Sequence, residues 1–449
     1  MMLIYFYLMN KFFLIIHIYI NIKMSFLRFF IVISCIIINI FSKIIQIPFK
    51  VIENNNKKSF IENLMTINIL SEIKIGDPLQ QEMDIHINFN HYYLYFSNKS
   101  IYDEKKSKAY EKLSDSKQYY FEPIKTGILS RDDIKIGNIH SKMNYILATE
   151  GENYIKKCSI GLKPTYEQKE KDNANIITYL KSTKEINSYT FTIIFNEKKN
   201  NIQTGEIIIG EFPHEYNKDQ YKIEYYQKMN IDKSQTLLYW GIKIDEIKLN
   251  QNRLYCDSYL ITFDIELGVF YGARSYYYEI NETFFDEAIR YEECRIEIVK
   301  DEQNNEYDYY VCNKNAKFSL VPDLIFFYNE NRNNFTFTYK DLFIQNGDEY
   351  YFLFLFNRDR SKNYNWVFGK RFMEKYHFVF DQDKFTIGFY TKILPKKINF
   401  WKYILFIILG IIIFSFGIIL GYLLIKKPRK KRANELLEEY DYSPNSINL

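Results

Sequence analysis

The chain has 449 residues, 47% of them hydrophobic and 25% charged, which is enough to bury large cores in more than one structural unit. Of its 59 basic residues, four lie in residues 1–43 and six in residues 426–449, which leaves 49 in between; of its 55 acidic residues, 51 lie there. This middle region is therefore almost neutral, which argues against a nucleic-acid-binding protein, because such proteins carry a basic face.

The first 42 residues are apolar and contain no acid, as expected for a signal peptide. Arg28 precedes an apolar run that extends from Ile31 to Phe41, and Met24 is an alternative start of the chain. We expect cleavage near Ser42, so that the residues after it are translocated. The alternative is an uncleaved N-terminal anchor.

Residues 403–425 contain no charge, and as a helix they would be about 35 Å long, enough to cross a hydrocarbon core. The basic run at 426–432 follows them, so the positive-inside rule places the tail, residues 426–449, in the cytoplasm. We therefore expect one transmembrane helix at 400–425 in a single-pass type I membrane protein, with a lumenal or extracellular ectodomain. Gly417 and Gly421 match the small-xxx-small pattern of helix-mediated dimers.

The middle region also carries motifs of a lumenal, oxidising compartment. Three N-glycosylation sequons begin at Asn98, Asn281 and Asn334. Cys294 and Cys312 have 17 residues between them, a spacing that suits a local disulfide. Cys158 and Cys256 have no obvious partner, and their redox state stays open. No spacing of cysteines resembles a zinc site, so no metal is expected.

Residues 47–400 alternate short apolar runs with polar turns, the pattern of an all-β protein. The clearest expected strands are residues 132–137, 189–195, 205–210 and 335–339. Helical periodicity is confined to short stretches near residues 174–182, 283–290 and 370–375.

The end of this region carries the most specific pattern. Residues 365–389 read Asn-Trp-Val-Phe-Gly-Lys-Arg-Phe-Met-Glu-Lys-Tyr-His-Phe-Val-Phe-Asp-Gln-Asp-Lys-Phe-Thr-Ile-Gly-Phe. They resemble the closing segment of the pepsin-like aspartic peptidases, in which a Trp-x-x-Gly strand, a short helix and a Phe-Asp…Ile-Gly-Phe hairpin complete the second lobe.

Shorter motifs resemble the same family in the right order, at residues 47–50, 160–162, 204–210, 239–244 and 320–327. The resemblance covers residues 47–395 and implies a bilobal all-β fold, with an N-terminal lobe at 43–215 and a C-terminal lobe at 216–398. Cys294 and Cys312 lie where the family has its second-lobe disulfide.

The family's mechanism uses no cofactor but needs two Asp carboxylates, each delivered by one lobe in an Asp-Thr-Gly turn. Repulsion between the two charges raises one pKa, so the pair shares a proton and activates a water that attacks the peptide carbonyl. In the second lobe, the resemblance places Asp264 at the catalytic position. Ile265 replaces the Thr and Glu266 replaces the Gly, so both supports of the turn have changed.

The first-lobe turn has no acid at the matching position. Residues 75–80 resemble the family's lead-in to the turn, and an ungapped count from them puts the Asp position at Ile87. One extra residue at Gln80-Gln81 improves the apolar alternation and puts the position at Asn88, followed by Phe89 and Asn90. An amide keeps the shape of a carboxyl group but cannot act as the base.

Two nearby side chains do not simply replace the missing acid. Asp84 lies on the same face of the strand as Asn88 but about 13 Å back along it. His91 comes three residues later and is expected to point the other way.

The resemblance also implies a flap hairpin over the cleft, with Tyr120 at the flap position that contacts substrate. Phe121 and Pro123 replace the flexible glycines of this hairpin, so its shape and mobility are expected to differ. No phosphate-binding loop or nucleophile elbow is found.

Two functions remain for a chain with this pattern. The first is a membrane-anchored pseudopeptidase whose cleft between the lobes binds a peptide or protein ligand without hydrolysing it. The alternative is an active aspartic endopeptidase whose first acid comes from Asp84, through a local bulge, or from Glu266.

Overall fold

The computed structural model describes residues 44–53, 59–97, 102–121, 124–151, 158–164, 174–199, 202–232, 239–249, 252–254, 259–318, 321–328, 333–359, 365–395 and 411. Residues up to Ile393 belong to one compact unit, and Leu394–Leu449 belong to a second. The expected signal peptide, the transmembrane helix apart from Ile411, the tail, Asn98 and Cys256 lie outside the described residues. No helix among the described residues is long and apolar enough to cross a membrane.

The largest sheet contains 14 strands from both halves of the chain. In spatial order they are β12 (Tyr226–Asn230), β27 (Thr386–Tyr390), β26 (Val379–Asp381), β10 (Thr190–Phe195), β11 (Gln203–Ile209), β1 (Ile45–Glu53), β2 (Ile67–Ile75), β3 (Gln81–Asn88), β9 (Cys158–Gly161), β4 (Leu94–Ser97), β8 (Ile139–Gly151), β7 (Ile124–Ile136) and β5 (Glu111–Lys112), with β6 (Lys117–Phe121) on β7.

Two smaller sheets belong to the second half of the chain. One contains β13 (Gly241–Ile244), β16 (Tyr259–Phe263), β25 (Trp366–Phe368), β17 (Phe270–Gly272), β24 (Phe354–Asn357), β19 (Glu306–Asn313), β23 (Glu349–Phe352) and β22 (Phe343–Asn346), with β18 (Cys294–Lys300) on β19. The other contains β15 (Asn252–Leu254), β14 (Glu246–Leu249), β20 (Leu324–Tyr328) and β21 (Asn333–Phe337).

The helices among the described residues are short. They are α2 (Phe60–Met65), α3 (Ile176–Ser182), α4 (Pro213–Tyr216), α5 (Tyr277–Ile280), α6 (Asp286–Arg290), α7 (Tyr339–Leu342) and α8 (Lys370–Tyr376), a π-helical turn η4 (Asn281–Phe285), and 3-10 turns η1 (Glu104–Lys106), η2 (Ile223–Tyr225) and η3 (Arg274–Tyr276). The expected mostly-β composition is confirmed, as are the helices near residues 174–182, 283–290 and 370–375.

The strands form because their apolar residues alternate with polar ones. In β1, Ile45, Ile47, Phe49 and Val51 are buried, whereas the residues between them are exposed. Side chains of a strand point alternately to its two faces, so this period of two places all four on the core side.

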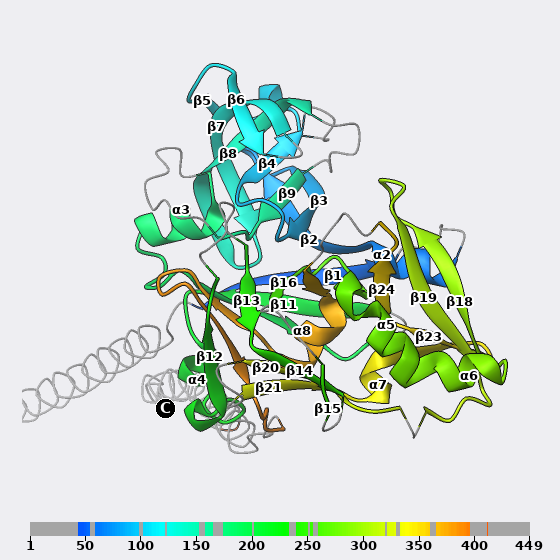
Figure 1. The fold of residues 1–449 in the computed structure, drawn as a ribbon. Helices are drawn as coiled ribbons and strands as arrows, with labels where there is room; N and C mark the ends of the chain where they lie inside the picture. Colours follow the sequence, from blue (N-terminus) through cyan, green and yellow to red (C-terminus); the bar gives the residue numbers. More distant parts are fainter. Residues whose placement is uncertain are drawn as a thin grey trace, which may run out of the picture. The chain divides into compact units, whose positions relative to one another are not determined.

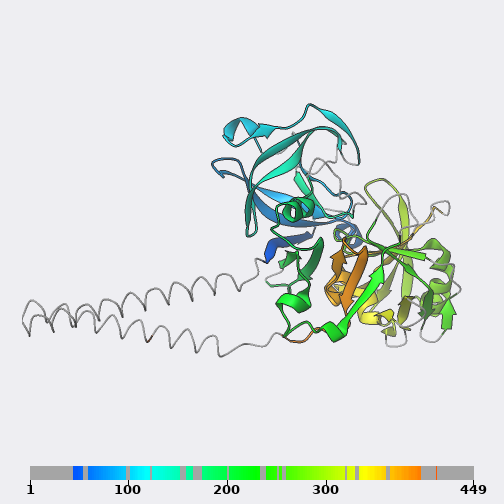
Figure 2. The same cartoon turned by 90° about the vertical axis from the view of Figure 1, so that its left-hand side faces the viewer.

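The last hairpin of the compact unit joins strands from the first half of the chain. β26 pairs with β10, with Phe380 opposite Phe191, and these two rings stack with centroids 4.9 Å apart. Figures 1 and 2 both show the orange C-terminal strands beside the green and blue strands of the large sheet. The Trp240 indole donates a hydrogen bond of 2.5 Å to the carbonyl of Leu162, which adds a second link between the two halves.

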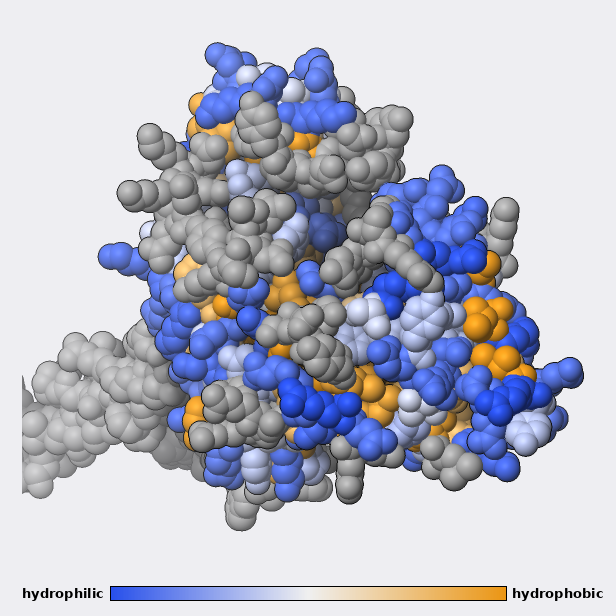
Figure 3. Space-filling view, viewed as in Figure 1, coloured by the Kyte–Doolittle hydropathy of each residue, from blue (hydrophilic) through white to orange (hydrophobic). Residues whose placement is uncertain are grey.

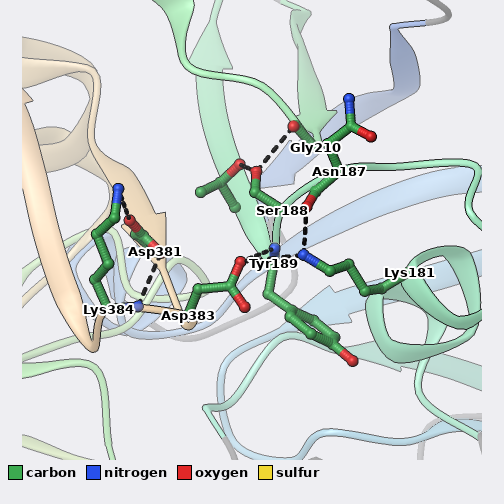
Figure 4. Close-up of polar contacts among 9 residues, drawn as sticks. Lys181, Asn187, Ser188, Tyr189, Gly210, Asp381, Asp383 and Lys384 are labelled. Carbon is green, nitrogen blue, oxygen red and sulfur yellow. Dashed lines mark hydrogen bonds and ion pairs between the residues drawn. The ribbon is translucent and has the colours of Figure 1, made fainter.

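Polar contacts secure the edge of this junction (Figure 4). Asp383, in the turn between β26 and β27, accepts a hydrogen bond of 2.9 Å from the backbone N–H of Tyr189 and lies 3.4 Å from the Lys181 ammonium. Ser188 donates a hydrogen bond of 2.9 Å to the carbonyl of Gly210. The C-terminal hairpin is therefore fixed to α3 and β10 by side chains as well as by strand pairing.

The face shown in Figure 3 is mostly hydrophilic, and hydrophobic colour appears in several separate places on it. Ile296 and Ile298 are the exposed apolar residues of β18. Among the described strands, β18 pairs only with β19, so these side chains lie on an outer strand of the sheet.

One partly buried histidine makes the stability of this fold depend on pH. Burial lowers the pKa of His377 from 6.5 to about 4, and its Nδ1 lies 2.8 Å from the hydroxyl of Tyr221. Between pH 6.5 and 4, the unfolded chain therefore binds a proton that the folded chain does not bind. Acidification over this range lowers the free energy of unfolding by up to about 3 kcal/mol.

We predict that the melting temperature falls between pH 6.5 and 4, and that the fall is smaller in a His377→Asn variant. Asn tolerates the left-handed conformation of this residue, whose φ is 42°. His140→Asn, at an exposed position, is the matched control and should melt as the wild type does. Equal pH profiles for His377→Asn and the wild type would contradict this assignment.

Candidate active site

The first-lobe turn begins where β3 ends, at Asn88. Met83, Ile85 and Ile87 are buried on one face of β3, as the alignment with one extra residue predicts. β3 runs parallel to β9, with Asn88 opposite Gly161. The strand therefore delivers Asn88 to the point where the chain bends away from the sheet.

The amide of Asn88 lies in a buried polar cluster. Its exposed fraction is only 4%, and its Nδ2 donates a hydrogen bond of 2.8 Å to Ser159 Oγ. The same nitrogen lies 3.2 Å from His91 Nε2, and His91 Nε2 lies 3.0 Å from Ser159 Oγ. The two N–H groups of the amide fit the hydroxyl and an unprotonated Nε2. Asn88, His91 and Ser159 thus form one hydrogen-bonded group, called the Asn–His–Ser cluster below.

The expectation that His91 points away from Asn88 is wrong. It assumed that the strand continues to residue 91, but β3 ends at Asn88 and the chain bends at Phe89 and Asn90. The bend returns the imidazole to Asn88. Sequence patterns identified neither this contact nor Ser159, although Ser159 directly precedes the Ile160-Gly-Leu motif.

The second-lobe turn begins where β16 ends, and Asp264 follows that strand directly. Its backbone N–H donates a hydrogen bond of 3.1 Å to the carbonyl of Phe368. The Asp264 Oδ1 accepts a hydrogen bond of 2.9 Å from the N–H of Glu266. Asp264 is partly exposed, in contrast to Asn88.

The two turns share their local geometry. The Asn88 Oδ1 accepts a hydrogen bond of 3.1 Å from the N–H of Asn90, two residues on, as Asp264 does from Glu266. A glycine lies against each turn: a Cβ on Gly161 would lie 2.1 Å from the carbonyl oxygen of His91, three residues after Asn88. Asn88, and not Ile87, is therefore the geometric equivalent of Asp264.

The matching glycine of the second turn is Gly369, where a Cβ would lie 2.2 Å from the carbonyl oxygen of Leu267, three residues after Asp264. Gly369 follows β25, which runs parallel to β16, just as Gly161 ends β9, which runs parallel to β3. The two strand–turn units are therefore built alike, as the paired turns of an aspartic peptidase site are.

The comparison with protein families agrees with this geometry. The family model described as eukaryotic aspartyl protease matches residues 86–392, which include both turns and the closing hairpin. The chain belongs to this family. A comparison with curated proteins found none that matches.

Relative to the usual turns of this aspartyl protease family, apolar side chains replace the two threonines. Phe89 is buried, and its ring centroid lies 5.0 Å from that of Phe380 and 6.0 Å from that of Phe191. In the second turn, Ile265 is fully buried. Aromatic and aliphatic packing therefore holds the turns where the family uses threonine hydroxyls.

Glu266 is the second acid of the second-lobe turn. It is 8% exposed, and its backbone carbonyl accepts a hydrogen bond of 2.8 Å from the N–H of Ile67. The pKa of Tyr95 is raised, mainly by burial and to a lesser degree by the charges of Cys158 and Glu266.

Asp84 does not supply the missing acid. It is exposed and lies opposite Glu72 in the pairing of β3 with β2. This pairing runs without a register shift from Gln81 to His86, so no bulge turns the Asp84 side chain toward the turn. The hypothesis that Asp84 supplies the first acid through a local bulge is therefore wrong.

Three further sequence-based expectations concern neighbouring parts of the site. A disulfide joins Cys294 and Cys312, as predicted. β6 and β7 form the expected flap hairpin, but the structure describes only the backbone of Tyr120, so its substrate-binding role stays a prediction. Cys158 is buried, and its thiol donates to the carbonyl of Asp84 at 2.9 Å.

The other two sequons that the structure describes differ in environment. Asn334 is exposed on β21. Asn281 is partly buried, and its Oδ1 accepts a hydrogen bond of 2.9 Å from the hydroxyl of Tyr310. Glycosylation at either position stays a prediction.

The Asn–His–Ser cluster should contribute to stability through its buried hydrogen bonds. We predict that Ser159→Ala lowers the free energy of unfolding by about 1–3 kcal/mol, because it removes the buried hydroxyl that contacts both the Asn88 amide and the His91 imidazole. Chemical denaturation measures this difference. Ser182→Ala, at an exposed serine that also donates a hydrogen bond, is the matched control and should cost much less. Equal losses in the two variants would show that the cluster is not a coupled buried group.

Proposed function

We propose that this chain is a membrane-anchored aspartyl protease homologue whose cleft between the lobes binds a peptide or protein ligand without hydrolysing it. The observation that carries this proposal is the identity of Asn88. Its position is geometrically equivalent to Asp264, and it places an amide where the mechanism needs a carboxyl group.

An amide cannot take part in the shared-proton chemistry of this family. Two carboxyl groups work because one is protonated while the other is ionised, so the pair supplies an acid and a base. The Asn88 amide has no proton that it gains or loses in this way, and its Nδ2 is engaged with Ser159. The one carboxyl group of Asp264 does not reproduce proton sharing between two carboxyl groups.

The substitutions beside the two turns support the same proposal. Phe89 and Ile265 are buried and bring no hydroxyl to the turns. The turns are therefore stabilised as part of the core, in a way that requires no catalytic function. Fold and function are separable in this manner, since activity depends on the site and not on the framework.

An active endopeptidase with an atypical pair of acids is the second candidate, and one observation favours it. Glu266 is largely buried at the second-lobe turn, and its charge acts on Tyr95 of the first lobe. A pair formed by Asp264 and Glu266 would place both acids on one lobe.

The location of the protein is part of the proposal. The uncharged run at 403–425 and the basic run at 426–432 support a type I single-pass anchor with a cytoplasmic tail. An exposed sequon at Asn334 and the Cys294–Cys312 disulfide fit a lumenal or extracellular ectodomain. Gly417 and Gly421 would provide the contact if the anchor forms a dimer.

We predict that the purified full-length chain does not cleave a peptide library between pH 3 and 7, because it lacks a second carboxyl group at the first-lobe turn. Mass spectrometry of the library after long incubation measures this, with Asp264→Asn run in parallel to identify contaminating proteases. Cleavage that persists in Asp264→Asn belongs to a contaminant. Cleavage that disappears in both Asp264→Asn and Glu266→Gln would contradict the proposal and establish the second candidate.

A further inference from the structure

A cavity of about 360 Å³ has Gly268, four residues after Asp264, in its wall. Residues of α2, β11, β22 and α8 line it. Gly268, which follows the turn, is part of its wall, but neither Asp264 nor Asn88 lines it. The cavity is therefore separate from the candidate active site and does not depend on the proposed function.

Three carboxylates near this cavity each have a lysine partner. The pairs are Glu53 with Lys198 at 2.9 Å, Asp341 with Lys375 at 2.8 Å, and Glu374 with Lys370. Lys370 is 7% exposed and also donates a hydrogen bond of 2.7 Å to Gln203 Oε1. The lysine charges and these carboxylates thus balance one another.

Arg371 is the fourth cation of this group, and it has no acid of its own. Its side chain is only partly exposed, and it makes no hydrogen bond or ion pair with any residue that the structure describes. Burial lowers the pKa of Arg371, and the more distant charges of Glu374, Glu53 and Asp341 only partly offset that effect. A guanidinium is costly to hold in this state unless an anion joins it.

The geometry around Arg371 provides room for such an anion. Arg371 lines both the 360 Å³ cavity and a second one of about 270 Å³, and Glu374 also lines both. Phe60, Leu64 and Ile344 give the larger cavity an apolar wall. A site that combines one guanidinium with an apolar wall suits a carboxylate attached to an apolar body.

We propose that this cavity binds an organic carboxylate, with Arg371 pairing the carboxylate and Phe60, Leu64 and Ile344 contacting its apolar part. A guanidinium binds a carboxylate through two parallel N–H···O bonds, whereas a lysine ammonium acts as a point charge. The same chemistry is available in a free organic acid and in the C-terminal carboxylate of a peptide, so the test includes both.

The test is calorimetric titration of the purified full-length chain with benzoate, with N-acetylphenylalanine as a peptide-like carboxylate, and with benzamide as a neutral control. Benzoate or N-acetylphenylalanine should bind, and benzamide should bind at least about tenfold more weakly, since it lacks the charge. The tighter of the two acids distinguishes a free acid from a chain terminus as the natural ligand. Absence of binding by both acids, or equal affinity for benzamide, would overturn the proposal.

Variants assign the binding to Arg371. Arg371→Gln should lower the affinity for the acid by about tenfold or more. Arg371→Lys should lower it less, because a lysine keeps the positive charge but lacks the two parallel N–H groups of a guanidinium. Arg290→Gln on α6 removes an exposed arginine that pairs with Asp286 and should leave the affinity unchanged. Unchanged affinity in Arg371→Gln would overturn the assignment.

Melting temperatures separate lost binding from lost folding. Without ligand, Arg371→Gln should melt no lower than the wild type, because it removes a charge that has no partner. Lys370→Met should melt lower, because it leaves Glu374 without its lysine. If Arg371→Gln does melt lower, the charge has an internal partner and the proposal fails.

Discussion

The pairing of β26 with β10 is the contact on which the site depends, because it joins a hairpin from the end of the compact unit to strands from its first half. Phe380 on this hairpin stacks on Phe191 and touches Phe89 of the first-lobe turn. A core of aromatic rings therefore fixes the turn that carries Asn88. The opposing turn, which carries Asp264, is built from β16 and β25 of the second half.

This arrangement supports the proposal that the framework of a peptidase persists here without its dyad. The two turns keep the same internal hydrogen bond and the same close glycine, so backbone geometry is retained on both sides. What has changed is the side-chain chemistry: an amide in the Asn–His–Ser cluster on one side and a single aspartate on the other. Packing by Phe89 and Ile265 makes the turns independent of the groups that catalysis would require.

Sequence patterns predicted the strands, the short helices, the Cys294–Cys312 disulfide and the family, because periodicity, spacing and the closing motif at residues 365–389 are local properties. They failed for His91, since a bend after Asn88 reverses the direction that a continuous strand would impose. They gave no sign of Arg371, because two of the three lysine–carboxylate pairs around it, Lys198 with Glu53 and Lys375 with Asp341, form only when distant elements meet. The fold was therefore easier to predict than the partners of individual polar groups.

The central claim is that the first-lobe turn supplies the amide of Asn88 in place of a carboxyl group, and carbon-13 NMR of labelled Asp and Glu side chains tests it most directly. We expect the chemical shift of the Asp264 carboxyl carbon to change with pH in one step that corresponds to one proton. We expect the same titration curve in Glu266→Gln. A two-step curve for Asp264 that becomes one step in Glu266→Gln would show two carboxyl groups sharing a proton. That result would contradict the account and assign the site to an active peptidase.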